Sequence, residues 1–192
     1  MKKFARLPLF VLLFCGIAIT ASATEPAATR SSTAEVLLVD DFNGDIQNGL
    51  FGYRSAFEAE PSSAKSLRTD HVFRGKAGKS LRLEVNRREA GFCGVWIHFF
   101  DMHAEVPRYF DASDYAYLSF WVRGESGGEA FQVQLADKTW IGKQDSLPLG
   151  EISELLPGGV TTTWQEVLVP LRPRDGLNLE ELGGLTLNFR ST

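Results

Sequence analysis

The sequence predicts an all-β fold, a β-sandwich of two antiparallel sheets with short helical turns only. Many short runs alternate between apolar and polar side chains, which is the period of a strand with one buried face. Turns rich in Gly, Pro and Ser separate these runs. No segment shows the helical period over three turns. Short strands with frequent turn signals are typical of a sandwich.

The first residues predict a secretory signal peptide. A start with three basic residues precedes an apolar run over 9–19, and Ala21 and Ala23 give the small-x-small pattern of a cleavage site. The run is too short to span a bilayer comfortably. A lipoprotein anchor at Cys15 is the alternative, and the bulky Phe14 before it argues against that reading.

The chain therefore divides into three parts. Residues 1–23 are the predicted signal peptide, 24–35 a flexible leader of small polar residues, and 36–192 one sandwich domain. Removing 23 of the 192 residues leaves 169, enough for a core of their own. We expect the mature protein to be secreted or periplasmic.

Charge and cysteine content exclude several functions. The mature chain carries 17 basic and 24 acidic residues, a net charge of −7. An acidic chain without a basic run is a poor partner for nucleic acid or for an anionic membrane. Cys93 is the only cysteine after the signal, so no intrachain disulfide can form, and its apolar surroundings predict a buried inert thiol.

The strands follow in order along the domain. Residues 80–86 place Leu81, Leu83 and Val85 on one face, and residues 94–101 alternate in the same way. Pro170 near the end of its run predicts an edge strand or a strand terminus. A single helical turn is expected at 151–156. The predicted strands are 36–39, 50–60, 80–86, 94–101, 115–124, 131–137, one or two within 140–149, 164–171 and 185–189.

The middle of the chain predicts a hairpin. Two alternating runs, 115–124 and 131–137, flank a turn that contains three glycines. If the aliphatic faces of both runs enter one core, aromatic side chains lie beside Arg and Gln on the opposite face. Such a surface suits flat, hydroxyl-rich ligands, because aromatic rings cover the apolar face of a sugar and planar amides or guanidinium groups bind its hydroxyls.

The candidate sugar-binding set lies on that face. Its members are Tyr117, Trp121, Arg123, Gln132 and Gln134, joined by Trp96 and His98. The competing interpretation is that both tryptophans lie under loops as secondary core, with Arg123 paired to Glu125 or Glu129. Trp164 opens a strand and is expected to pack.

The order of segments resembles carbohydrate-binding modules of the galactose-binding-like jelly-roll type, related to family eleven. The resemblance covers most of residues 36–189 and rests on VLLVDDFNGD, GKSLRLEV, GVWIHFF, YFDASDYAYLSFWVRG, FQVQLAD, TTTWQEVLVPL and LGGLTLNF. It implies a further strand after the last of these, which pairs with the first strand. The domain is thus expected to lack its last strand or to be truncated at its C-terminus, and a partner chain is expected at the open edge.

The resemblance also implies a structural calcium ion that joins the first and last strands. Asp40, Asp41, Asn43 and Asp45 surround Gly44, and calcium takes six to eight oxygen ligands of these kinds. An Asx-rich turn at the end of a strand is the alternative.

These features predict an exported, non-catalytic carbohydrate-binding module for a polysaccharide, alone or as part of a longer glycoside hydrolase. One alternative is a small polysaccharide lyase or glycoside hydrolase on the same sandwich, with carboxylates from Asp101, Asp111 and Asp114. Another is an assembly or interaction domain related to complex I assembly proteins. No catalytic residue is assigned, because no nucleophile elbow, phosphate loop or Cys–His pair is present.

Overall fold

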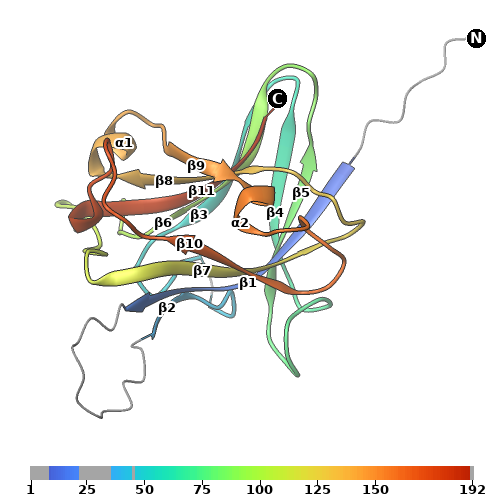
Figure 1. Ribbon diagram of the computed structural model, residues 1–192, viewed down its shortest axis with the longest axis horizontal. Coiled ribbons are helices and arrows are strands. Elements are labelled where there is room, and N and C mark those ends of the chain that lie inside the picture. The colour runs from blue at the N-terminus through green and yellow to red at the C-terminus, as the bar shows by residue number, and fades with distance from the viewer. Residues whose placement is uncertain (1–8, 22–35, 45, 191–192) are drawn as a thin grey trace, which may run out of the picture.

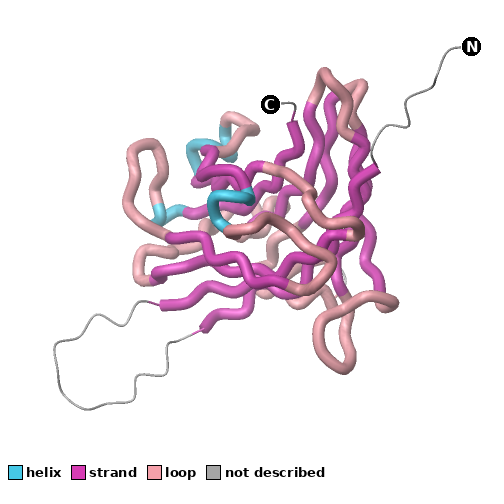
Figure 2. Tube along the Cα trace, turned by 45° about the vertical axis from the view of Figure 1, so that its right-hand side comes forward, coloured by secondary structure: helices cyan, strands magenta, loops and turns pink. Residues whose placement is uncertain are grey.

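Two antiparallel sheets pack face to face around one apolar core (Figure 1). The computed structural model describes residues 9–21, 36–44 and 46–190. The tube in Figure 2 consists mainly of strands and loops, with little helix. The predicted fold class, an all-β sandwich of antiparallel sheets with short helical turns, is confirmed.

The first sheet has six strands in the described part of the chain. The strand order is β10-β7-β1-β5-β4, and β2 pairs with β1 outside this path. The strand bounds are β1 (Leu9–Ala21), β2 (Val36–Asp40), β4 (Ser63–Thr69), β5 (Ser80–Asn86), β7 (Tyr115–Gly124) and β10 (Gln165–Pro170). The edge position predicted from Pro170 is confirmed, because β10 ends the row.

Among the described residues, the second sheet has five strands in the order β3-β6-β11-β8-β9. Their bounds are β3 (Arg54–Ala59), β6 (Phe92–His98), β8 (Gln132–Asp137), β9 (Leu147–Glu151) and β11 (Leu182–Arg190). Within the ranges that the structure describes, three short helical segments connect strands: α1 (Lys138–Gly142), α2 (Ile152–Leu155) and a 3₁₀ turn at Leu179–Glu181. The helical turn predicted at 151–156 is α2.

The core follows the period-two pattern of the sequence. Each strand that crosses it presents alternate apolar residues inward, and these are almost fully buried. The clearest cases are Leu81, Leu83 and Val85 on β5; Val95 and Ile97 on β6; Leu118, Phe120 and Val122 on β7; Val133 and Leu135 on β8; and Leu185, Leu187 and Phe189 on β11. Cys93 is also fully buried, as expected, and burial raises the pKa of its thiol to about 11.

The predicted hairpin between 115–124 and 131–137 is wrong, although both strands form. β7 lies in the six-stranded sheet and β8 in the five-stranded sheet. The amides of Gly124 and Gly128 bond to carbonyls of residues 160–161, and the Glu129 carboxylate accepts from the amides of residues 126 and 127. Phe131 then enters the core. The glycine-rich segment therefore crosses between sheets instead of turning within one.

Two other segments differ in detail from the prediction. Of the one or two strands predicted within 140–149, one forms as β9, because Trp140 lies in helix α1, where the Asp137 carboxylate accepts a hydrogen bond from its amide as an N-cap. β4 was not predicted, because most of its residues are partly exposed and its sequence, SAKSLRT, shows no strong alternation.

The apolar run near the N-terminus forms β1, between β5 and β7 (Figure 1). Ile17 and Ile19 are buried in the core. β1 also pairs with β2, the first strand of the predicted domain. The cleavage site at Ala23 and the leader 24–35 lie outside the described residues, so signal cleavage stays a prediction.

Candidate functional site

The outward face of the five-stranded sheet brings together aromatic and amide side chains. Strand register aligns Trp96 of β6 with Thr186 of β11, and Thr186 with Gln134 of β8. The next row runs from Gly94 through Asn188 to Gln132. Each row thus passes from the β6 side of the sheet, across a small polar residue, to an amide on β8.

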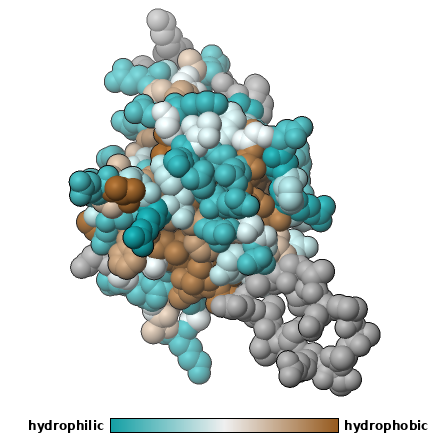
Figure 3. Space-filling model, turned by 90° about the vertical axis from the view of Figure 1, so that its left-hand side faces the viewer, coloured by the Kyte–Doolittle hydropathy of each residue, from teal (hydrophilic) through white to brown (hydrophobic). Residues whose placement is uncertain are grey.

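A groove of about 880 Å³ lies over these rows. The strands form its floor, and helix α1 with the segment that leads to β9 forms one side. Figure 3 shows the end of the molecule where α1 lies, with apolar surface gathered between polar groups. The lining residues are Phe57, Phe92, Trp96, His98, Phe100, Met102, Gln134, Ala136, Ile141, Lys143, Gln144, Asp145, Ser146, Gly184, Leu185, Thr186 and Asn188.

An aromatic ladder forms one wall of the groove. The ring centroids of Trp96 and His98 lie 4.1 Å apart, those of His98 and Phe100 lie 4.8 Å apart, and both pairs are stacked. Tyr109 continues the row, with its centroid 4.6 Å from that of Phe100. The ladder fixes the orientation of each ring before any ligand arrives.

His98 is a neutral member of this ladder. Burial lowers its pKa to about 4, and its Nδ1 atom is buried without a hydrogen-bond partner among the described residues. A charged imidazolium there would lose solvation without gaining a partner. Near neutral pH the ladder therefore presents uncharged aromatic surface.

Phe57 and Phe92 extend the apolar wall beyond the ladder. Phe57 of β3 pairs in register with Gly94, where a Cβ atom would clash first with the Leu187 backbone carbonyl and would also lie only 2.9 Å from the Phe57 ring. The Phe57 and Phe92 rings lie 6.1 Å apart, and Phe92 is 47% exposed. Glycine at position 94 therefore lets an aromatic ring lie over the strand.

A chain of hydrogen bonds forms the polar wall. Gln132 donates to Glu151 over 3.3 Å, Gln134 donates to Gln132 over 2.6 Å, and Ser146 donates to Gln134 over 2.6 Å. Both glutamines are buried, with 6% and 4% exposed. Between the walls, Asn188 Oδ1 is buried without a partner in the described part of the chain.

The seven predicted ligand-binding residues fall into two groups. Trp96, His98, Gln132 and Gln134 lie on the grooved face. Tyr117, Trp121 and Arg123 lie on the outward face of the other sheet, because β7 and β8 belong to different sheets. The Arg74 guanidinium lies 3.6 Å from the Trp121 ring centroid, so the ring is partly covered. The expectation that all seven share one surface is wrong.

Sequence reasoning missed several groove residues. Phe92 is in phase with Trp96 along β6, and Thr186 and Asn188 alternate with the buried Leu185, Leu187 and Phe189 of β11, so alternation alone would have added all three. Phe57 lies in a strand without clear alternation. Lys143, Asp145 and Ser146 come from the segment around α1 that was expected to be strand, and only the fold places them at the groove.

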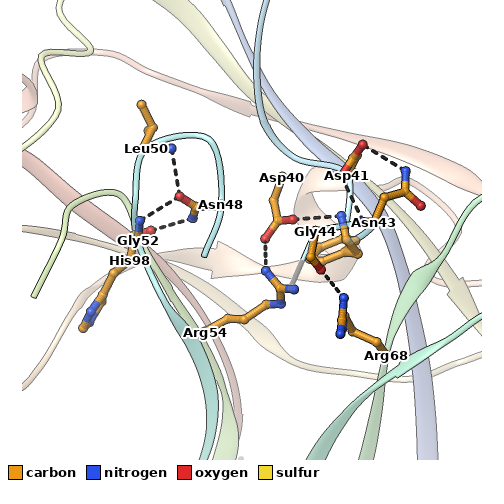
Figure 4. Close-up of polar contacts among 11 residues, drawn as sticks. Asp40, Asp41, Asn43, Gly44, Asn48, Leu50, Gly52, Arg54, Arg68 and His98 are labelled. Atoms are coloured by element: carbon orange, nitrogen blue, oxygen red, sulfur yellow. Dashed lines mark hydrogen bonds and ion pairs between the residues drawn. The ribbon is translucent and has the colours of Figure 1, made fainter. Parts of the chain in front are cut away.

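The Asp40 turn is arranged around a guanidinium group (Figure 4). Asp40 Oδ2 lies 2.6 Å from Arg54 Nη1, and both side chains are almost fully buried. Asp40 Oδ1 accepts from the amide of Phe42. Burial raises the pKa of the Asp40 carboxyl, and the charge of Arg54 offsets part of that rise. Because Asp40 ends β2 and Arg54 begins β3, this ion pair joins the two sheets.

The other described residues of the turn also have protein partners. Asp41 accepts from the backbone and side-chain nitrogens of Asn43, and Asn43 Oδ1 accepts from the amide of Lys79. Arg68 donates to the Gly44 carbonyl. In this arrangement the side-chain oxygens of Asp40, Asp41 and Asn43 do not fit a calcium ion, because the guanidinium group of Arg54 already lies against Asp40. Asp45 lies outside the described residues, and no group of three metal-binding side chains occurs among the described ones.

Two of the three carboxylates considered for glycoside hydrolysis, Asp101 and Asp111, have local roles. Asp101 accepts from the amide of His103, and Asp111 accepts from the amide and hydroxyl of Ser113. The bonds from Ser113 lower the pKa of Asp111, whereas a general acid needs a raised pKa.

The described helices are all short, and none of them has the length and apolar composition that a membrane-spanning helix requires.

Comparisons with known proteins match a carbohydrate-binding family. The family described as Carbohydrate binding domain 30 matches residues 42–174. A crystal structure of a family 30 carbohydrate-binding module matches with a TM-score of 0.53 and 24% identity, over 65% of this chain and 65% of that one. The chain therefore spans slightly less than two thirds of that protein.

A second solved structure has the same fold. The family 30 carbohydrate-binding module of the cellulosomal cellulase Cel9D-Cel44B of Clostridium thermocellum matches with a TM-score of 0.50 and 22% identity, over 71% of this chain and 88% of that one. No curated protein matches this chain. The expected relation to family eleven and the missing last strand stay predictions. The lyase, hydrolase and complex I alternatives gain no support from these matches.

Proposed function

The chain belongs to the family of carbohydrate binding domain 30, and from this premise we propose that it binds a polysaccharide in the groove of the five-stranded sheet. The observation that supports this site is the row from Trp96 through Thr186 to Gln134. It places aromatic surface opposite amide groups, with a small residue between them. A sugar ring has both apolar faces and hydroxyl edges, so it complements the two walls.

The lining of the groove favours an uncharged glycan. The groove carries one basic residue, Lys143, and one acidic residue, Asp145, and His98 is neutral near pH 7. An acidic polysaccharide would gain no net attraction from this set. We therefore propose a β-linked glucan or a similar neutral chain as the ligand class.

The size of the aromatic wall agrees with ordinary glycan affinities. Covering roughly 80 Å² of apolar surface contributes about 2 kcal/mol, whereas millimolar to micromolar binding requires about 4–8 kcal/mol. One ring is insufficient, and Trp96 with Phe57 or Phe92 plus several hydrogen bonds supplies the required range. The role is binding without catalysis, alone or beside a catalytic domain.

The matched pair Trp96→Ala and Trp121→Ala tests the proposed site. Affinity electrophoresis of the unmodified protein through gels that contain soluble neutral glucans should show retardation on at least one of them. Trp96→Ala should weaken that retardation by about 30-fold in affinity, the equivalent of about 2 kcal/mol, and Trp121→Ala should leave it unchanged. The reverse result would place the site on the Tyr117, Trp121 and Arg123 face.

The same samples test the alternative that the protein is a polysaccharide lyase or glycoside hydrolase. Incubation of the unmodified protein with each retarding glucan should release no reducing ends. Release that disappears in Asp101→Asn would support an enzyme instead.

We further propose that the protein acts outside the cytoplasm, after cleavage at Ala23. The proposal rests on the basic start, the apolar run over 9–19 and the small residues before the predicted cleavage site. Fractionation of cells that express the full chain should place the mature protein in the periplasm or the medium. Accumulation of the full-length mass in the cytoplasm would contradict it.

A further inference from the structure

Strand β1 occupies a central position in the six-stranded sheet. Residues 9–14 pair with β5 over 81–86, and residues 12–21 pair with β7 over 115–124. Residues 17–20 pair with β2 over 36–40. All three pairings are antiparallel, so β1 connects three other strands of its sheet.

The residues of β1 are also those predicted to leave with the signal peptide. The apolar run over 9–19 precedes the predicted cleavage site at Ala23. The family match begins at residue 42, after both β1 and β2. Cleavage at Ala23 would remove β1, although its neighbours β5 and β7 belong to the predicted sandwich domain. It would also leave β2 without β1, its partner strand in the described sheet.

The vacated position has the dimensions of one strand. Neighbouring strands lie about 4.8 Å apart, so β5 and β7 would face each other across about 10 Å, a gap too narrow for an α-helix with its side chains. Backbone donors and acceptors along both edges would lose partners, and such edges pair readily with another extended segment.

The chemistry of the position selects an apolar segment. Ile17 and Ile19 of β1 are 1% and 0% exposed, and their register partners on β7, Phe120 and Leu118, are fully buried. A segment that replaces β1 must therefore place apolar side chains at these two alternate positions. A charged side chain at either position would be buried in the core without a partner.

We propose that the processed protein takes up an extended apolar segment of another polypeptide, with β7 on one side of it and β5 and β2 in turn on the other, antiparallel to all three strands. The partner is recognised by backbone pairing and by two aliphatic side chains at the places of Ile17 and Ile19. The site lies in the opposite sheet from the glycan groove, so one domain would hold a polysaccharide on one sheet and a protein strand in the other.

The test uses protein recovered after export, with its mass measured first, and a labelled synthetic peptide of residues 9–21 as the probe. We expect a mass that begins at Thr24, saturable one-to-one binding, and new protection of β5 and β7 amides in hydrogen exchange. A control peptide with Ile17→Asp and Ile19→Asp should bind at least about 100-fold more weakly.

Three results would overturn the proposal. The first is that the exported protein retains residues 9–21. The second is that both peptides bind equally or not at all. The third is that the β7 amides are protected without peptide, because another part of the same chain fills the position. If the processed protein is recovered unfolded, a full chain with a protease site between residues 24 and 35 is cut, unfolded and refolded with excess labelled peptide. Incorporation of the label supports the proposal, and refolding without it, or failure to refold, overturns it.

Discussion

The two sheets of this domain use their outward faces differently. The five-stranded face has rings held in a ladder, buried amides in a hydrogen-bonded chain, and a groove over both. The six-stranded face also carries an aromatic and an arginine, Trp121 and Arg123, but Arg74 covers the tryptophan ring. The same residue types therefore form a proposed site on one sheet only, because a binding face requires an accessible and pre-arranged surface as well as the right composition.

The largest expected effect comes from the contact that joins the two sheets. Arg54→Met leaves Asp40 buried without its cation and should lower the free energy of unfolding by about 3–5 kcal/mol. The double variant Arg54→Met with Asp40→Leu should recover part of that loss. Urea denaturation measures both. Glucan affinity of the folded fraction should stay unchanged, because the pair lies away from the groove lining.

Thermal unfolding tests whether the Asp40 turn holds calcium. Chelation with EDTA should leave the midpoint of thermal unfolding unchanged, because Arg54 supplies the positive charge next to Asp40. A rise in the midpoint on addition of calcium, lost in Asp41→Asn, would contradict this and restore the predicted ion.

The next effect is the pH dependence of stability through His98. Its pKa of about 4 in the folded protein lies below the ordinary value of 6.5, so between these values the unfolded chain binds the additional proton. Stability is therefore fully present above pH 6.5 and is lost as pH falls toward 4, by up to about 3 kcal/mol. The variant His98→Phe should lose this pH dependence, whereas His71→Phe, at an exposed position, should retain it.

A smaller effect is expected from the polar wall. Gln134→Leu removes the link between Gln132 and Ser146 and should weaken glucan binding about tenfold, because hydrogen bonds in the buried chain lose a partner. Gln165→Leu on β10, in the other sheet, is the matched control and should bind normally. Isothermal titration calorimetry distinguishes the two; equal losses would show that the effect is not local to the groove.

The smallest effect is expected at the exposed end of the aromatic wall. Phe92 is 47% exposed beside the groove, and Leu168 on the other sheet is 48% exposed. Phe92→Ala should weaken glucan binding by about fivefold, or about 1 kcal/mol, and Leu168→Ala should not change it. Titration of both variants in parallel shows whether the bound glycan reaches Phe92, and unchanged affinity in Phe92→Ala would contradict this prediction.

The sequence predicted most strands because their alternation is strong. Leu81, Val95 and Phe120 are buried as their positions indicate, and the edge strand β10 was identified from Pro170. It did not predict which sheet each strand joins, because a glycine-rich turn permits both a hairpin and a crossing between sheets. The hydrogen bonds that decide the matter come from residues 160–161, far along the chain.

The candidate site was predicted only in part, because alternation indicates which face of a strand a side chain occupies but not which strands are neighbours in a sheet. Alternation correctly placed Trp96, His98, Gln132 and Gln134 on the outward faces of their strands. It could not show that β11 lies between β6 and β8, which is what aligns Trp96 with Thr186 and Gln134. Nor could it show that β7 carries Tyr117, Trp121 and Arg123 to the opposite side of the molecule.

The most direct test of the proposed site is an NMR titration that follows the indole N–H signals of the tryptophans, assigned by single Trp→Phe variants. Saturation with a retarded glucan oligosaccharide should shift the signal of Trp96, on the grooved face, and leave that of Trp121 in place. A shift of the Trp121 signal with an unmoved Trp96 signal would contradict the account.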